Sequence, residues 1–563
     1  MTNTSTAHPK GLYVLFTTEM WERFNFYGMR ALLTLFMAEA LMMGEKDASI
    51  VYGGFLGLCY LTPMLGGYLS DKFLGNRNCI LLGGFAMAMG QFLLFASAST
   101  FTGDIAFAKS LMWSGLIVII FGNGFFKPNI SSMVGQLYPP AEKNKLDSAF
   151  TIFYLGINVG ATLGQFICPL VGDVKSIDGV RDLSAFRWGF LAAGIAMLLA
   201  CVMFYILKNK YIITHDGKEI GGRPDRKQMK LDSANQATFT NQSIISTIVL
   251  LVLLTIGFHY GSLDSTVDVQ NPIKVWLYPF IYSAGLSLAF LIISDKSLTK
   301  VERDRIFVLY IVAFFVMFFW AAFEQAGSSL TFIADKQTDT NIMGWNMPPS
   351  MVQNFNGIFV IIFAIPFSMF WMWLNKKGVE PISPVKQSWG LALIAIGYLI
   401  IAYQVKDIGI SGKIGVIWLI LLYLLHTWGE LCLSPIGLSL VAKLAPVRFS
   451  SLLMGVWFIA NAAGYALAGT LGALLPPTGD KYAKAQEMGI DLAGVLGGNV
   501  IATTEQIALL NQNKIPTAFP TFAGFAIHNL YEFFMLFVIL PGIAAVLLLM
   551  LTPLMKKLMH GVR

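Results

Sequence analysis

The chain has 563 residues, of which 56% are hydrophobic and only 13% are charged, and its mean hydropathy is +0.64. Soluble globular proteins carry about 25% charged residues, so this composition excludes a soluble enzyme and indicates a polytopic membrane protein. The formal net charge of +7 is modest and gathers in alternate loops, which argues against nucleic-acid binding.

The first apolar segment holds an unusual set of charges. Glu19, Glu22, Arg23 and Arg30 all lie inside it. On a helix, Glu19 and Arg23 are four residues apart, and Arg23, Tyr27 and Arg30 share one face. A charge at the bilayer centre costs about 2.5–3.5 kcal/mol, so four of them predict partners and a polar cavity. A static Glu19–Arg23 pair that only joins two helices is the competing interpretation.

Apolar windows long enough to span a bilayer follow one another along the chain. They fall at about 11–42, 50–70, 79–99, 105–126, 147–170, 187–207, 243–260, 275–294, 306–332, 352–374, 388–404, 414–435, 450–475 and 523–555. The sequence therefore predicts an all-α polytopic membrane protein with about fourteen transmembrane helices.

The spacing of these windows predicts two bundles of six helices with two extra helices between them. The corresponding domains are an N-terminal bundle at 11–207, a cytoplasmic connector with two inserted helices at 208–305, and a C-terminal bundle at 306–555. Two six-helix halves are the plan of the major facilitator fold. The loop from Gly67 to Arg77 (GYLSDKFLGNR) is similar to that superfamily's signature between helices two and three, where the acidic and basic residues would hold a gating contact.

Lysine and arginine set the predicted orientation. The segments Lys208–Lys230, Asp295–Arg305 and Lys556–Lys557 are rich in positive charge and fall on one side of a fourteen-helix chain. Because cytoplasmic loops carry an excess of these residues, both termini are predicted to be cytoplasmic, in a multi-pass protein of the inner membrane. The stretch 476–522 then lies outside and has little membrane character.

Further polar side chains lie within the later apolar segments. Those singled out are Lys127, Asn158, Glu324, Asn356 and Glu430. Together with the first segment they supply acids and bases in near-equal numbers, which predicts salt bridges that form and break as protons and a zwitterionic substrate move. Two simpler interpretations stay open: Lys127 snorkels from a helix end to the surface, and Asn158 serves as a hydrogen bond between helices.

Other chemistries find little support in the sequence. The five cysteines lie in or beside apolar segments without metal-site spacing, so we expect small core residues and no disulfides. There is no H-E-x-x-H, no G-x-S-x-G in a clear context and no Walker A loop, which argues against an enzyme. We expect no cofactor.

The motifs resemble those of the proton-dependent oligopeptide transporter (POT) family across essentially the whole chain. That family's first-helix signature, E-x-x-E-R-F-x-Y-Y-G, reads EMWERFNFYG from Glu19 to Gly28, and its fifth-helix signature, F-Y-x-x-I-N-x-G, is intact from Phe153 to Gly160. Other similar stretches surround Lys127-Pro128, Phe319–Glu324, Gly378–Pro381 and Gly429–Ser439. The two inserted helices are similar to those of bacterial members. One departure is Phe26, which replaces the first Tyr of the Y-Y pair and removes a hydroxyl from the predicted cavity.

The resemblance implies roles for individual residues. Proton coupling would involve Glu19, Glu22, Arg23 and Glu324. Salt-bridge gates would pair Arg30 with Glu324 on the periplasmic side and Lys127 with Glu430 on the cytoplasmic side. Peptide-binding residues would be Arg30 and Lys127 for the carboxylate, Glu430, Asn158 and Asn356 for the amino group, Tyr27, Tyr60 and Ser434 for the peptide backbone, and Trp320 and Trp457 for side-chain pockets.

The implied function is import of di- and tripeptides with protons as the coupling ion, by alternating access across the cytoplasmic membrane. A transporter of the same fold with another cargo, such as nitrate or another small metabolite, stays open as the alternative. A membrane receptor is disfavoured, because a sensor has no need for a proton relay. The implied partners are small peptides, protons and the lipid bilayer, and the sequence specifies no oligomeric state.

Overall fold

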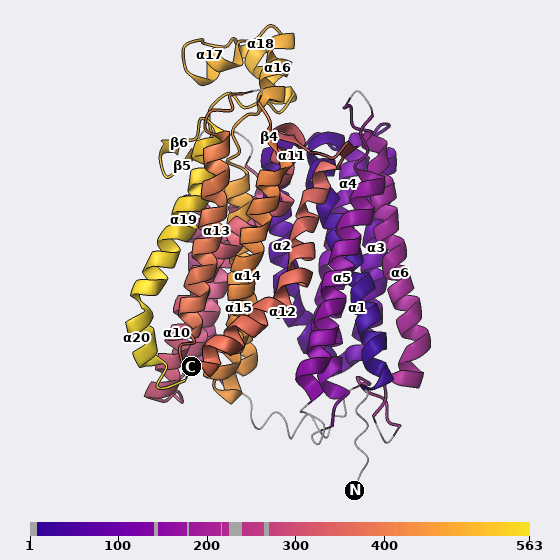
Figure 1. Cartoon of the computed structure of the whole chain (residues 1–563), viewed down its shortest axis with the longest axis vertical. Helices are drawn as coiled ribbons and strands as arrows, with labels where there is room; N and C mark the ends of the chain where they lie inside the picture. The colour runs from indigo at the N-terminus through magenta and orange to yellow at the C-terminus, as the bar shows by residue number, and fades with distance from the viewer. Residues whose placement is uncertain are drawn as a thin grey trace. The chain divides into compact units, whose positions relative to one another are not determined.

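The computed structural model describes residues 8–139, 145–176, 179–214, 217–223, 239–263, 270–410 and 412–562. Part of the predicted basic segment Lys208–Lys230 therefore lies outside the described residues. The chain divides into two compact units (Figure 1). The first comprises Met1–Phe36 and Leu58–Ala237, and the second comprises Met37–Gly57 and Thr238–Arg563.

The first unit is built from six long helices. They are α1 (Lys10–Leu35), the second half of α2 (Gly44–Leu69), α3 (Asn76–Thr100), α4 (Ile105–Gln136), α5 (Leu146–Gly172) and α6 (Phe186–Tyr211), with short turns η2 (Ser70–Leu74) and η4 (Leu183–Ala185). α1 packs against α5 and α6, and α3 packs against α4 and α6. Gly160 of α5 allows a close approach to α1, because a Cβ there would collide with the backbone of Met20.

Arg77, the last residue of the Gly67–Arg77 signature, orders the chain that follows α6. Its guanidinium donates to the carbonyl oxygens of Ile220 at 2.7 Å and Ile212 at 2.5 Å, and to the Asn209 side chain at 2.9 Å. Both carbonyls belong to the segment that leaves the C-terminal end of α6. Arg77 is therefore a structural residue within the first unit, and the gating contact expected for this signature stays a prediction.

The segment Met37–Gly57 is continuous with the first unit at both of its ends and yet packs within the second. It contains most of the π-helical turn η1 (Phe36–Ala40) and the first half of α2. The hydroxyl of Tyr278 donates to the carbonyl oxygen of Ile50 in α2 at 2.7 Å. This bond joins the segment to the second inserted helix.

The second unit contains the inserted helices and the remaining long helices. Its helical elements are α8 (Asn241–Ser262), η6 (Ile273–Leu277), α9 (Tyr278–Ile293), α10 (Lys300–Phe323), η7 (Glu324–Gly327), α11 (Ser329–Lys336), η8 (Pro349–Gln353), α12 (Asn354–Lys376), α13 (Ser383–Val405), α14 (Val416–Leu444), η9 (Val447–Phe449), α15 (Ser450–Gly472), α19 (Leu530–Met550) and α20 (Thr552–Leu558). α13 packs against α14 and α19, α10 against α15, and α9 against α8 and α15.

Short elements connect the long helices of this unit. β1 (Thr338–Asp339) pairs in parallel with β4 (Ile414–Gly415), and β2 (Asn341–Ile342) with β3 (Trp345–Asn346) and β5 (Thr521–Phe522) with β6 (Phe525–Ala526) form hairpins. The stretch 476–522 contains α16 (Gly479–Glu487), α17 (Leu492–Leu496) and α18 (Thr504–Gln512). These three helices enclose a small apolar core of their own, made of Ala485, Ile490, Leu492, Leu496, Leu510 and Ile515.

The prediction of an all-α polytopic membrane protein is confirmed. Thirteen helices in the described part of the chain are long and apolar enough to cross a membrane, and α1, with its internal charges, accounts for the fourteenth predicted span. Some boundaries differ. α4 continues to Gln136 and α14 to Leu444, past their apolar windows. The predicted span 306–332 is interrupted at Glu324, where α10 gives way to the 3₁₀ turn η7.

Candidate functional site

The predicted proton-coupling cluster of the first unit is assembled within α1. Arg23 Nε donates to Glu19 Oε1 at 2.6 Å and lies 2.9 Å from Glu22 Oε2, and all three side chains are buried. One guanidinium thus serves two carboxylates, so these three groups carry one excess negative charge. Lys127 of α4 interacts electrostatically with Glu22 and Arg23. The two carboxylates and two cations of this cluster therefore all belong to the first unit.

Two more cations of the first unit lie over tyrosine rings. The Lys127 ammonium is 3.9 Å from the centroid of the Tyr60 ring, and the Arg30 guanidinium carbon is 5.2 Å from the centroid of the Tyr27 ring. Such contacts attract a cation to the face of the ring. Lys127 is half-buried, and its role in the cavity stays a prediction.

Asn158 is half-buried on α5, and its amide donates to the carbonyl oxygen of Tyr154 at 2.9 Å. This bond stays within one helix, so it does not provide the interhelical contact that was the simpler interpretation.

In the second unit, α12 and α14 bring an amide and a carboxylate together. Asn356 Nδ2 donates to Glu430 Oε2 at 2.9 Å and to Thr427 Oγ1 at 3.0 Å. Glu430 and Asn356 are half-buried, as is Ser434, one turn beyond Glu430 on α14. The predicted Asn356 and Glu430 are therefore neighbours in one site.

Glu324 caps the C-terminal end of α10 and is 3% exposed. The hydroxyl of Tyr52, in the first half of α2, donates to Glu324 Oε2 at 3.3 Å. Trp320 lies one turn earlier on α10, with its ring centroid 5.8 Å from that of Tyr465. Trp457 of α15 is buried against Gly437 of α14. Both tryptophans thus pack within the second unit.

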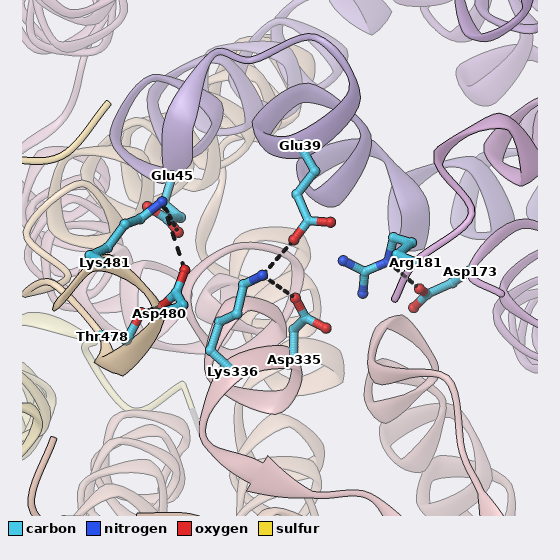
Figure 2. A network of polar contacts seen from close by, with 9 residues as sticks. All are labelled: Glu39, Glu45, Asp173, Arg181, Asp335, Lys336, Thr478, Asp480 and Lys481. Carbon is cyan, nitrogen blue, oxygen red and sulfur yellow. Dashed lines mark hydrogen bonds and ion pairs between the residues drawn. The ribbon is translucent and has the colours of Figure 1, made fainter. Parts of the chain in front are cut away.

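Ion pairs tie the segment Met37–Gly57 to α11 and α16 (Figure 2). Lys336 Nζ donates to Glu39 Oε1 at 2.7 Å and lies 3.1 Å from Asp335 Oδ2. Lys481 Nζ is 3.2 Å from Glu45 Oε1 of α2. The side chains of these two interhelical pairs are 17–26% exposed, which places the pairs between surface and core. Figure 2 also shows a separate pair of the first unit, in which Arg181 Nε donates to Asp173 Oδ1 at 2.8 Å.

Three polar contacts were missed by sequence reasoning. Thr427 had a signal, since it lies three residues before Glu430 and shares its helix face. Tyr52 and Lys336 had none, because their partners Glu324 and Glu39 are 272 and 297 residues away along the chain. The two predicted gate pairs combine one residue from each unit, and they stay predictions.

A sequence model of the POT family matches residues 77–484. The peptide transporter YePEPT of Yersinia enterocolitica is 34% identical over 479 residues, which cover 83% of this chain and 88% of that protein. A di-/tripeptide transporter of Lactococcus lactis is 29% identical over 480 residues, covering 82% of this chain and 88% of its own length. The family match begins at Arg77, so the α1 cluster lies outside the matched stretch.

Solved structures of POT family transporters share the fold. One in complex with a thioalcohol-conjugated peptide has a TM-score of 0.70 and 26% identity, and one in complex with 5-aminolevulinic acid has a TM-score of 0.69 and 27% identity. Each likeness covers 98% of this chain and 97% of the solved chain. The predicted fold class is confirmed by these likenesses.

Proposed function

The chain belongs to the POT family, and from this premise we propose that it is a symporter that imports di- and tripeptides together with protons. The similar proteins named above are transporters, and this chain is a transporter rather than an enzyme. Its two units would expose a substrate site to each side of the membrane in turn.

The observation that carries the proposal is the placement of opposite charges in the two units. The first unit presents the cations Arg30 and Lys127 beside tyrosine rings, and the second presents Glu430 held by Asn356. A peptide is a zwitterion, so its carboxylate suits the first set and its amino group suits the second. Tyr27, Tyr60, Asn158 and Ser434 would complete the contacts to the peptide backbone, and Trp320 and Trp457 would shape the walls.

Proton coupling would reside in the α1 cluster and in Glu324. When Glu22 takes up a proton, it loses its negative charge and Arg23 keeps Glu19 as its anionic partner. The cluster therefore has two charge arrangements, and an equilibrium between two arrangements is what a proton must bias to drive a conformational change. The gates would form and break in alternation, Arg30 with Glu324 and Lys127 with Glu430.

A small zwitterion other than a peptide is the second candidate cargo. A POT family transporter that is 27% identical to this chain was solved with 5-aminolevulinic acid, which carries an amine and a carboxylate like a peptide. Nitrate has no cationic end, so it would make no use of the Glu430 carboxylate.

We place the protein in the cytoplasmic membrane with both termini inside. The support is the positive charge of Lys376, Lys377, Lys443 and the tail lysines Lys556 and Lys557, which fall on one predicted side. Protons are the proposed coupling ion, and no other cofactor is invoked.

The test is uptake of labelled dialanine into proteoliposomes with an imposed inward proton gradient, before and after addition of a protonophore. Accumulation that the protonophore abolishes is expected from the wild type. Glu22→Gln and Glu324→Gln should each reduce proton-driven accumulation about tenfold or more, a loss of about 1.4 kcal/mol or more, because a glutamine cannot take up the coupling proton.

Glu487→Gln is the matched control, because Glu487 is an exposed carboxylate on α16. It should accumulate dialanine like the wild type. If folded wild-type protein accumulates no peptide but concentrates 5-aminolevulinic acid, the cargo is a smaller zwitterion. If accumulation survives the protonophore, proton coupling is wrong.

A further inference from the structure

The turn between η1 and α2, residues 41–44, comes shortly after the chain has passed from the first unit to the second at Phe36–Met37. Two of its residues have a left-handed backbone, Met42 with a φ of 51° and Gly44 with a φ of 79°. A left-handed backbone is uncommon for a methionine and persists where the surrounding structure holds it. This turn therefore depends on contacts from other parts of the fold.

The stretch 476–522 supplies two such contacts. Lys481 Nζ of α16 lies 3.2 Å from Glu45 Oε1, in the first turn of α2 (Figure 2). A Cβ at Gly44 would lie only 3.1 Å from the Cβ of Lys514, so the aliphatic stem of Lys514 lies across the glycine backbone. Lys514 follows α18 and is itself left-handed, with a φ of 55°. Two separate positions of the stretch thus meet two adjacent residues of the turn.

The small apolar core of the stretch fixes these two lysines in one body. Ala485 lies one helical turn after Lys481, and Ile515 follows Lys514 directly, and both are buried in that core. Residues 476–522 lie outside every candidate membrane span of the described chain. The stretch is therefore a compact attachment to the second unit that builds no part of the membrane bundle.

The ion pair between Lys481 and Glu45 is partly buried, with side chains that are 17% and 20% exposed. Asp480 Oδ2 lies 3.9 Å from the same ammonium, and the Thr478 hydroxyl donates to Asp480. Salt screens a partly buried pair less than an exposed one, and an ordered neighbouring carboxylate holds the lysine in place. The pair can therefore contribute to where the turn is held.

The segment Met37–Gly57 contains this turn and is the part of the second unit that the chain joins to the first unit at both ends. When the units rock, this segment either stays with the second unit and bends at its ends, or leaves the second unit together with the first. Contacts that hold the segment on the second unit favour the first of these two arrangements.

We propose that the stretch 476–522 is a strap, which fastens the segment Met37–Gly57 to the second unit through Lys481 and Lys514 and so restrains the opening of the two units at their predicted outer ends. This inference rests on the alternating access of the proposed function, and it does not depend on the cargo. The strap sets how readily the segment leaves the second unit, so transport continues without it.

The experiment is double electron–electron resonance on the full chain in lipid nanodiscs. The five native cysteines are buried, so nitroxides attach to introduced ones. The segment pair, Lys46→Cys with Asp407→Cys, reports whether the segment leaves the second unit. The unit pair, Thr102→Cys with Asp407→Cys, reports the rocking itself. All three labelled positions are exposed.

Lys481→Glu should raise the ratio of long to short distances in the segment pair about fivefold, which corresponds to about 1 kcal/mol, because an attraction becomes a repulsion. Glu45→Lys should do the same, and the double substitution Glu45→Lys/Lys481→Glu should restore the wild-type ratio. Lys484→Glu is the matched control, since Lys484 is an exposed lysine of the same helix, and it should leave the ratio unchanged.

The two labelled pairs separate the failure of the strap from the failure of alternating access. If the unit pair shows two distance classes but neither single charge reversal changes the segment pair, the strap is overturned and alternating access stands. If the double substitution does not restore the ratio, the ion pair does not fasten the segment and the proposal is likewise overturned. A single distance class for both pairs in every variant overturns alternating access and the strap together. No peptide is needed, so a different cargo leaves the test unaffected.

Discussion

Asn356 holds the carboxylate of Glu430 in place. Its amide donates both to Glu430 and to Thr427, so it orients the carboxylate that we propose for the amino group of a peptide. A hydrogen bond to a charged group contributes about 1.5–3 kcal/mol. Asn356→Leu should therefore weaken dipeptide binding about tenfold or more, as measured by tryptophan fluorescence or calorimetry on the purified protein.

Asn346→Leu is the control for this change. Asn346 accepts a hydrogen bond from Asn341 on the exposed β2–β3 hairpin, where no peptide contact is proposed. Equal dissociation constants for Asn356→Leu and the wild type would remove Asn356 from the binding site.

Glu380 makes a pH-dependent contribution to stability. Burial alone would raise the pKa of Glu380, but the hydrogen bonds from Lys386 and Asn375 outweigh it and hold that pKa below its ordinary value. A carboxyl group of this kind stabilises the fold above its unfolded pKa of about 4.3, and its contribution is lost as the pH falls through the folded pKa. Glu380→Gln should therefore lower the unfolding temperature at pH 7, and the difference from the wild type should shrink below about pH 4. Thermal unfolding across this pH range, with Glu487→Gln as the control, would contradict the assignment if the difference did not change.

The inserted helices are attached to the rest of the second unit mainly through α9. Within α8, no residue is buried, whereas α9 buries Tyr278, Ile281 and Ser283 among others. The buried Tyr278 hydroxyl bonds the backbone of α2, which lies outside the inserted pair. An α9 docked in this way stabilises the first half of α2.

Tyr278→Phe tests the attachment by removing one hydroxyl. The loss of a buried hydrogen bond costs about 1 kcal/mol, so the unfolding temperature should fall. Tyr403→Phe, at a side chain that is 60% exposed, should leave it unchanged. Equal unfolding temperatures for the two variants would mean that this hydrogen bond does not stabilise the fold.

The stretch 476–522 is an element with its own stability. Leu510 is completely buried in its core, while its neighbour Leu509 is 37% exposed. Leu→Ala in a core costs about 2–5 kcal/mol, which is more than so small a core can lose. Leu510→Ala should therefore expose this stretch to limited proteolysis while peptide uptake persists. Equal protection of Leu510→Ala and Leu509→Ala would contradict a separate core.

At the scale of the whole chain, the two units are joined twice within the first two helices. The polypeptide passes between them at Phe36–Met37 and again at Gly57–Leu58. The first passage coincides with the π-helical turn η1, a form of helix that is rare and often marks functional sites. The third crossing, at Ala237–Thr238, lies outside the described residues, and we expect rocking of the units during transport to change the backbone at the two described crossings.

The proposed symport should also be electrogenic. Dialanine at neutral pH has no net charge, so each proton transported with it moves one positive charge into the cell. An inside-negative potential of 100 mV supplies about 2.3 kcal/mol per charge, which raises the limiting accumulation of dialanine roughly 50-fold per proton. Uptake into liposomes with a potassium-diffusion potential would measure this. If dialanine accumulation does not depend on the membrane potential, transport moves no net charge.

Hydropathy and local spacing were sufficient to predict the helices and the α1 cluster. The apolar windows mark which residues must leave water, and four-residue spacing places Glu19 and Arg23 on one helix face, where they are ion-paired. The signature motifs also identified the family, because each motif is a contiguous stretch of the chain.

Only the tertiary structure decided which distant side chains meet. Glu324 with Tyr52, Asn356 with Glu430, and Lys336 with Glu39 each join segments far apart in sequence. It also assigned the first half of α2 to the second unit and gave 476–522 a core. The physical reason is that hydropathy specifies burial without specifying a partner. Helix partners are chosen by the fit of whole surfaces, such as Gly160 against the backbone of Met20, which no single segment contains.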